Sequence, residues 1–128
     1  MAATKTRDSA QLRAWREMSA AHARVADALE RELQREHELS LAEYEVLQRL
    51  AETDDGHLRM QELAEVSPLS ASALSRLLGR LERAGLAERE ICDDDRRGIY
   101  ACLTDDGRAV ERAAAPTFRA TLARTLGS

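Results

Sequence analysis

The chain has 128 residues, of which 44% are hydrophobic and 33% are charged, and this balance predicts one folded domain over residues 1–128 rather than a disordered chain. Only 3% of the residues are aromatic, so Leu, Ala and Val must build the core, which favours packed helices. No apolar run approaches the roughly 18 residues of a membrane span, and residues 1–8 contain no apolar stretch of a signal peptide. We therefore expect a cytoplasmic protein.

The charge is distributed unevenly along the chain. The net charge of −4 is unfavourable for binding nucleic acid, but residues 27–65 alone carry twelve acidic and four basic side chains. Within residues 70–85, by contrast, Arg76, Arg80 and Arg83 outnumber Glu82. An acidic total therefore does not exclude DNA binding by the segment that begins near residue 70.

Residues 10–36 are predicted to form a long amphipathic helix, because apolar side chains recur there at spacings of three or four. The stripe consists of Leu12, Trp15, Met18, His22, Val25, Leu29 and Leu33. A stripe of this length needs a partner surface, either within the chain or on a second copy.

Ser40 and Glu43 form a capping box that predicts the start of a second helix. The turn residues Asp54-Asp55-Gly56 should end that helix near Thr53.

A helix-turn-helix is predicted next. Residues 57–59 suit a short strand and residues 60–66 a short helix, which Ser67-Pro68-Leu69 ends because proline disfavours helix in the residue before it. Ser70 can cap the following helix, and Gly85 occupies the position that ends it. The apolar face of this helix consists of Leu74, Leu77, Leu78 and Leu81.

A charged hairpin and a last helix complete the pattern. Residues 87–92 and 99–104 have strand patterns, and the polar segment 93–98 joins them as a wing. Thr104-Asp105-Asp106-Gly107 can open the last helix, in which Pro116 should introduce a kink. Its apolar side consists of Val110, Ala114, Phe118, Leu122 and Leu126. The predicted fold class is mainly α with a small β-hairpin wing.

Three segments of the sequence resemble the MarR family of bacterial regulators: LSLAEYEVLQRLAE, LRMQELAEVSPLSASALSRLLGRLERAGLAERE and DDDRRGIYACLTDDGRAV. The similarity extends over residues 12–118 and is most specific over residues 58–107. It implies a winged helix-turn-helix domain with a DNA-binding lobe at 40–104 and a homodimer formed through helices 10–36 and 105–126. It also implies a pseudo-palindromic operator and, often, a small phenolic or other amphipathic effector.

One departure from the family bears on dimerisation. The family normally ends with a further helix that clasps the first helix of the partner, whereas this sequence stops at Ser128. We therefore expect either that dimerisation rests on residues 10–36 and 105–126 alone or that the chain is a shortened form.

The side of the predicted reading helix that faces away from its leucines supplies the DNA-binding candidates. These are Ser70, Ala71, Ser72, Ser75, Arg76 and Arg80. Residues near the start of such a helix reach base edges, and arginine can donate two hydrogen bonds to guanine. Arg76 is the first choice for base readout, with Ser72 and Ser75 beside it. An ordinary solvated helix face would have a similar composition. Gly79 either permits close approach of the helix backbone to DNA or is simply tolerated. A glycine within a helix lowers its stability by about 1 kcal/mol relative to alanine.

The predicted wing tip supplies further candidates. Arg96 and Arg97 would enter or flank the minor groove. Asp94 or Asp95 would orient an arginine, either Arg80 or Arg97, through a charge-assisted hydrogen bond. An acid precedes an arginine by two residues in both possible pairs, so the sequence does not distinguish them. A polar hairpin tip is also common in proteins that do not bind DNA.

Other kinds of site are weakly indicated. Trp15, His22 and Tyr44 could line an effector pocket between the first helix and the lobe, although Trp15 and His22 also suit core or dimer packing. Cys92 and Cys102 have no zinc-binding spacing and the histidines are scattered, so we expect no metal site and no cofactor. The cysteines suit small apolar filler better than oxidant sensors.

The sequence contains no nucleophile elbow, phosphate loop or acid–base set, so we do not expect an enzyme. The main hypothesis is a homodimeric transcription regulator that binds duplex DNA sequence-specifically and acts as a repressor. The alternative is a shortened dimerising module or antagonist that does not itself bind DNA, which the net negative charge and the early end suggest.

Overall fold

The computed structural model describes residues 2–91 and 98–127, with side chains described from residue 9 onward. A mainly helical fold with a small three-stranded antiparallel sheet confirms the predicted fold class. The elements of the described residues are, in order, α1 (Ala2–His37), α2 (Leu41–Ala51), β1 (His57–Arg59), α3 (Met60–Val66), α4 (Ala71–Arg83), β2 (Ala87–Ile91), β3 (Ile99–Leu103) and α5 (Asp105–Leu126).

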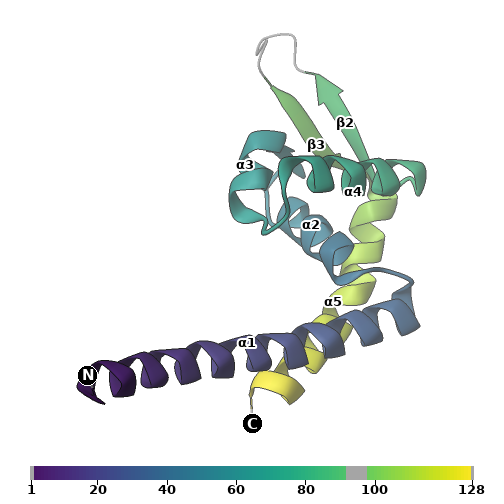
Figure 1. The fold of residues 1–128 in the computed structure, drawn as a ribbon. Coiled ribbons are helices and arrows are strands. Elements are labelled where there is room, and N and C mark those ends of the chain that lie inside the picture. Colours follow the sequence, from purple (N-terminus) through teal and green to yellow (C-terminus); the bar gives the residue numbers. More distant parts are fainter. Residues whose placement is uncertain (1, 92–97, 128) are drawn as a thin grey trace.

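Two long helices, α1 and α5, cross beneath a lobe that contains α2, α3, α4 and the sheet (Figure 1). The N-terminal half of α1 extends beyond the rest of the molecule. This helix begins at Ala2 rather than near residue 10, and α5 continues across Pro116 to Leu126. His37 and Thr117 join the two long helices, with 2.7 Å between Nε2 and Oγ1. No helix in the described part of the chain is long and apolar enough to cross a membrane.

The core lies where α2, α4, the sheet and the C-terminal end of α1 meet. The four leucines predicted for the apolar face of α4 are each at most 1% exposed. They belong to one buried cluster, whose other members are Leu33, Leu39, Tyr44, Val46, Leu47, Leu50, Leu63, Ala87, Ala101 and Ala114. The Tyr44 ring stacks on Phe118 of α5 at a centroid distance of 4.9 Å, so aromatic packing ties α5 to the lobe.

The sheet has the strand order β1-β3-β2, so the short strand β1 pairs with β3 on the side away from β2. Ala101 of β3 lies opposite Leu58 and Arg89, and Cys102 lies opposite His57 and Glu88. Because side chains alternate along a strand, Ala101 and Cys102 point to opposite faces. The face with Ala101 packs into the core, which places β2 beside α4.

Candidate nucleic-acid interface

The start of α4 is built by short-range hydrogen bonds. Ser70 has extended backbone angles, and its Oγ accepts a hydrogen bond from the Ala73 amide at 3.2 Å. The Ser67 Oγ accepts from the Leu69 amide at 3.1 Å, which orders the turn between α3 and α4. At the other end, Gly85 takes a positive φ of 78° and the Leu86 amide donates to the Leu81 carbonyl. The sequence therefore defines both ends of this helix locally.

The face of α4 opposite the leucines is accessible. Ala71, Ser72, Arg76 and Arg80 are exposed, whereas Ser75 is half-buried. The Ser72 and Ser70 hydroxyls lie 3.4 Å apart at the start of the helix. A shallow depression between this face and β2 is lined by Ser75, Arg76, Gly79, Arg80, Glu82, Arg83 and Arg89. Basic side chains dominate this lining, which suits a phosphate-bearing ligand.

Arg89 is a residue of this surface that the sequence analysis did not single out. Its guanidinium donates to the Ser75 carbonyl, and its Nε lies 3.1 Å from the Glu82 Oε1. Both partners belong to α4 whereas Arg89 lies on β2, so this side chain holds the wing strand against the helix. The sequence does contain an indication of this position. Arg89 lies two residues after Ala87 on the same strand, so both side chains are on the face of β2 that lies toward α4.

Arg80 has a partner that was not anticipated either. Its Nε lies 4.0 Å from the Glu43 Oε2, and the same Glu43 closes the capping box of α2 by accepting from the Ser40 amide. The Arg80 side chain is half exposed, so this pair is a weak restraint. It nevertheless directs Arg80 toward Glu43 of α2, whereas Asp94 and Asp95, which the sequence analysis considered as its partners, lie outside the described residues.

The junction between the lobe and α5 is formed by Thr104. Its Oγ1 donates to the Gly85 carbonyl at 2.7 Å and accepts from the Gly107 amide at 2.9 Å, and its amide donates to the Leu86 carbonyl. A Cβ added to Gly107 would lie 1.9 Å from the Leu86 carbonyl oxygen. The first turn of α5 therefore lies directly against the backbone that follows α4.

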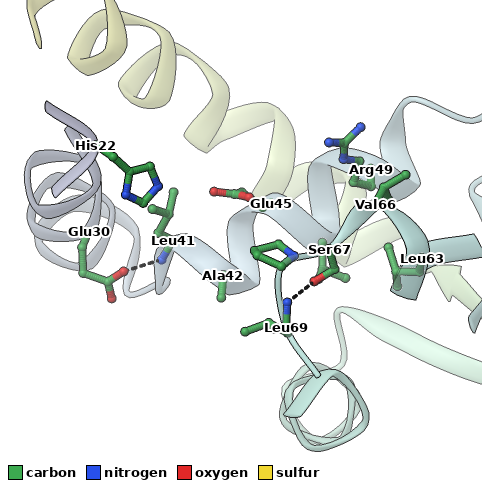
Figure 2. A pocket seen from close by; sticks show the side chains of 12 residues that line it. His22, Glu30, Leu41, Ala42, Glu45, Arg49, Leu63, Val66, Ser67 and Leu69 are labelled. Atoms are coloured by element: carbon green, nitrogen blue, oxygen red, sulfur yellow. Dashed lines mark hydrogen bonds between the residues drawn. The ribbon is translucent and has the colours of Figure 1, made fainter. Parts of the chain in front are cut away.

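A separate pocket of about 260 Å³ opens between α1, α2 and the turn before α4 (Figure 2). It is lined by His22, Glu30, Leu41, Ala42, Glu45, Val46, Arg49, Leu63, Val66, Ser67, Pro68 and Leu69. Glu30 spans one edge, where its Oε2 accepts from the Leu41 amide at 2.8 Å. The lining is mostly apolar with a few charged groups, as in many small-molecule sites.

The three residues considered for an effector pocket are not brought together. Only His22 among them lines the pocket; Trp15 is 62% exposed further along α1, and Tyr44 is buried against Phe118. Burial raises the pKa of Tyr44 to about 12, with a smaller contribution from Glu111. The effector-site hypothesis therefore keeps His22 and exchanges the other two for neighbours such as Arg49.

Cys102 is buried, and burial, followed by the negative charge of Glu90, raises its pKa to about 12. A thiol that stays protonated at neutral pH is a poor nucleophile, which agrees with its interpretation as filler rather than as an oxidant sensor. Cys92 lies outside the described residues, as do the wing-tip candidates Asp94, Asp95, Arg96 and Arg97.

Comparison with known proteins identifies the family. A family model described as "MarR family" matches residues 37–98. AbsC, a MarR family transcriptional regulator from Streptomyces coelicolor, is 36% identical with a TM-score of 0.83, and the match covers 88% of this chain and 76% of AbsC. Sco3205, another from that organism, solved in complex with DNA, is 38% identical with a TM-score of 0.83, covering 91% of this chain and 72% of Sco3205. The chain belongs to the MarR family.

A curated relative supports the same assignment over a shorter span. The uncharacterized HTH-type transcriptional regulator YfiV of Bacillus subtilis (strain 168) is 31% identical over 75 residues. These residues are 59% of this chain and 46% of YfiV, so the match spans less than half of that relative. The match to the MarR family model begins at the end of α1 and ends at residue 98, just before β3, so it contains α4 and Arg89 but leaves out most of α1, all of β3 and all of α5.

Proposed function

We propose that this MarR family protein is a homodimeric repressor that binds a pseudo-palindromic site in duplex DNA, with α4 in the major groove and the wing beside it. The observation that carries the proposal is the joint surface of α4 and β2. Arg76 is exposed on a helix whose N-terminus is capped by Ser70, and Arg89 fixes the wing strand to that helix. This arrangement presents a basic helix face and a wing as one unit.

The exposed apolar side chains of α1 support the homodimer. Leu12 is 45% exposed and Trp15 and Met18 are each 62% exposed, although they continue the stripe whose C-terminal members Leu29 and Leu33 are buried. Neighbouring exposed apolar residues of this size mark interaction sites. Leu126, near the end of α5, is also 62% exposed. Pairing of these faces in two copies would hold two α4 helices at a fixed spacing.

The pocket between α1, α2 and the turn before α4 supports regulation by a small amphipathic or phenolic effector. It includes Pro68 and Leu69, which immediately precede the cap of α4, and His22 of α1. A ligand between these elements would change the position of α4 relative to α1, and thereby the spacing of the two reading helices. The test is to add candidate phenolic ligands to the protein–DNA complex. We expect them to release the DNA from the parent protein but not from His22→Ala.

DNA binding is tested by selecting duplexes from a random pool and comparing two arginine variants on the selected site. Arg76→Ala should lower affinity about ten- to hundredfold and relax specificity at one position, because a bidentate base contact contributes about 1–3 kcal/mol. Arg112→Ala is the matched control, since it removes the same charge from an exposed position on α5.

Two outcomes would contradict the proposal. Equal affinity of Arg76→Ala and the parent would show that α4 is not the reading helix. Absence of any bound duplex, together with stable self-association, would favour a dimerising module without DNA binding. Affinity that falls steeply with salt would instead exclude that second function.

A further inference from the structure

The outer face of the sheet gathers three side chains that can bind a metal ion. His57 of β1, Glu90 of β2 and Cys102 of β3 each offer one ligand atom, and these atoms all lie within 4.8 Å of one another. The strand register explains this: His57 and Glu88 are the two cross-strand neighbours of Cys102, and Glu90 follows Glu88 on the same face.

We propose that His57, Glu90 and Cys102 form a binding site for a divalent cation of the zinc type. Zinc takes imidazole nitrogen, carboxylate oxygen and thiolate sulfur as ligands, and sites with three protein ligands keep the fourth position for water. Calcium and magnesium prefer oxygen ligands throughout, so a sulfur and a nitrogen in the set select against them. One thiolate and one carboxylate also balance the charge of a divalent ion.

The surroundings favour this assignment. Asp55 lies beside the His57 ring, with 3.5 Å between its Oδ2 and Nδ1, and a carboxylate in this position commonly orients a histidine ligand. Cys102 is 4% exposed, so its sulfur lies at the base of the cluster while His57 and Glu90 are accessible from outside. When the ion binds, the Cys102 thiol loses its proton to solvent and the sulfur forms the metal bond.

The basic side chain Arg59 lies on the same face of the sheet and is directed to another group. Its Nε donates to the Tyr100 hydroxyl at 3.1 Å, and its guanidinium lies 5.7 Å from the centre of that ring. Glu88, by contrast, adds a further negative charge opposite Cys102. The carboxylates of Asp55, Glu88 and Glu90 outnumber the single guanidinium of Arg59 among these neighbours, so the local charge is acidic, which attracts a cation.

A bound ion would cross-link all three strands at the base of the wing. Arg89 lies on the opposite face of β2, between Glu88 and Glu90, and contacts α4. Fixing β2 from its outer face would therefore also fix the strand that α4 contacts. An effect of the ion on DNA affinity rests on the proposed function. Metal binding itself can be measured whether or not the protein binds DNA.

The site is tested on the full chain with cobalt(II) as the probe, followed by displacement with zinc. A thiolate ligand gives cobalt a charge-transfer band in the near ultraviolet, and four-coordination gives intense visible bands. We expect one equivalent to bind with both signatures and zinc to displace it. His57→Ala and Glu90→Gln should each weaken binding at least about tenfold, which is the scale at which even supporting groups act.

Matched controls are available within the chain. Cys102→Ser should remove the charge-transfer band, whereas Cys92→Ser and His22→Ala should keep it. His57 and Glu90 are exposed, so their variants are expected to fold even where Cys102→Ser does not, and circular dichroism checks this. The Arg76→Ala variant should bind cobalt like the parent, which separates failure of this site from failure of the DNA-binding proposal.

The inference is overturned if cobalt and zinc do not bind in a saturable way. It is equally overturned if His57→Ala combined with Glu90→Gln binds as tightly as the parent, or if the charge-transfer band depends on Cys92 instead of Cys102.

Discussion

The apolar faces of α4 and of the N-terminal half of α1 differ in what covers them. In α4, Leu74, Leu77, Leu78 and Leu81 are all buried by α2 and the sheet of the same chain. In α1, Leu12, Trp15 and Met18 remain exposed on a part of the helix that extends past the lobe. The leucine face of α4 is therefore covered within the chain, whereas the described residues leave this face of α1 uncovered.

The contrast also shows how the two regions are coupled. The lobe is joined to α5 through Thr104 and Gly107, and α5 is joined to α1 through Thr117, whose hydroxyl donates to the Glu36 carboxylate at 3.1 Å. These are short, specific contacts between rigid helices. The hydrogen bonds therefore form a chain of contacts from α1 through α5 to the residues that follow α4.

The largest effect is expected from removing one leucine of the covered face. Leu78→Ala should lower the free energy of unfolding by about 2–5 kcal/mol, because it leaves a cavity in the core. Leu12→Ala, the same substitution on the uncovered face, should cost less than about 1 kcal/mol in dilute protein. Urea unfolding of both variants measures the difference. Similar losses in the two variants would show that α1 is already covered within the chain.

A second effect concerns association rather than folding. Trp15→Ser should weaken self-association by about 2 kcal/mol or more, roughly thirtyfold, because a large aromatic side chain at an interface often dominates the binding energy. Sedimentation over a range of concentrations measures the dissociation constant. Arg112→Ser, at an exposed position of α5, provides a control for substitutions on the long helices. An unchanged dissociation constant for Trp15→Ser would mean that the dimer uses another surface.

The junction between the two regions offers a third test. Gly107→Ala should destabilise the protein by about 1–3 kcal/mol, since the added methyl would meet the Leu86 carbonyl and the Leu103 side chain. Helix propensity alone predicts a gain of about 1 kcal/mol for the same change. Thermal unfolding distinguishes the two signs. A stabilised Gly107→Ala would show that α5 can shift away from Leu86 at little cost.

Local signals in the sequence predicted the lobe well. The capping box at Ser40, the cap at Ser70 and the glycine at Gly85 each act through neighbouring residues, so the bounds of α2, α3 and α4 could be predicted closely. The start of α1 at Ala2 could not, because Asp8 and Ser9 are residue types that often cap a helix and the apolar stripe begins only at Leu12, yet the helix runs through them.

The site residues that the sequence did not reveal depend on contacts between distant segments. Arg89 is one such residue, because its partners on α4 follow only from the packing of β2. The His57 cluster depends on the strand register in the same way, since histidine and cysteine positions that are scattered along the chain become neighbours across β1 and β3. Tyr44 was considered for an effector site, but its stacking on Phe118 requires α5 to cross α2.

The smallest expected effect lies on the exposed face of α4. Gly79→Ala should stabilise the protein by up to about 1 kcal/mol, because alanine is the better helix former and an added Cβ would be 3.6 Å from the nearest atom, on Arg83. This is the same substitution as at Gly107 with the opposite predicted sign, so the pair shows whether tight packing or helix propensity decides each position. DNA affinity should stay unchanged. If a stabilised Gly79→Ala bound the selected duplex more weakly, the α4 backbone would have to approach the DNA closely at this turn, and glycine would be required there for binding.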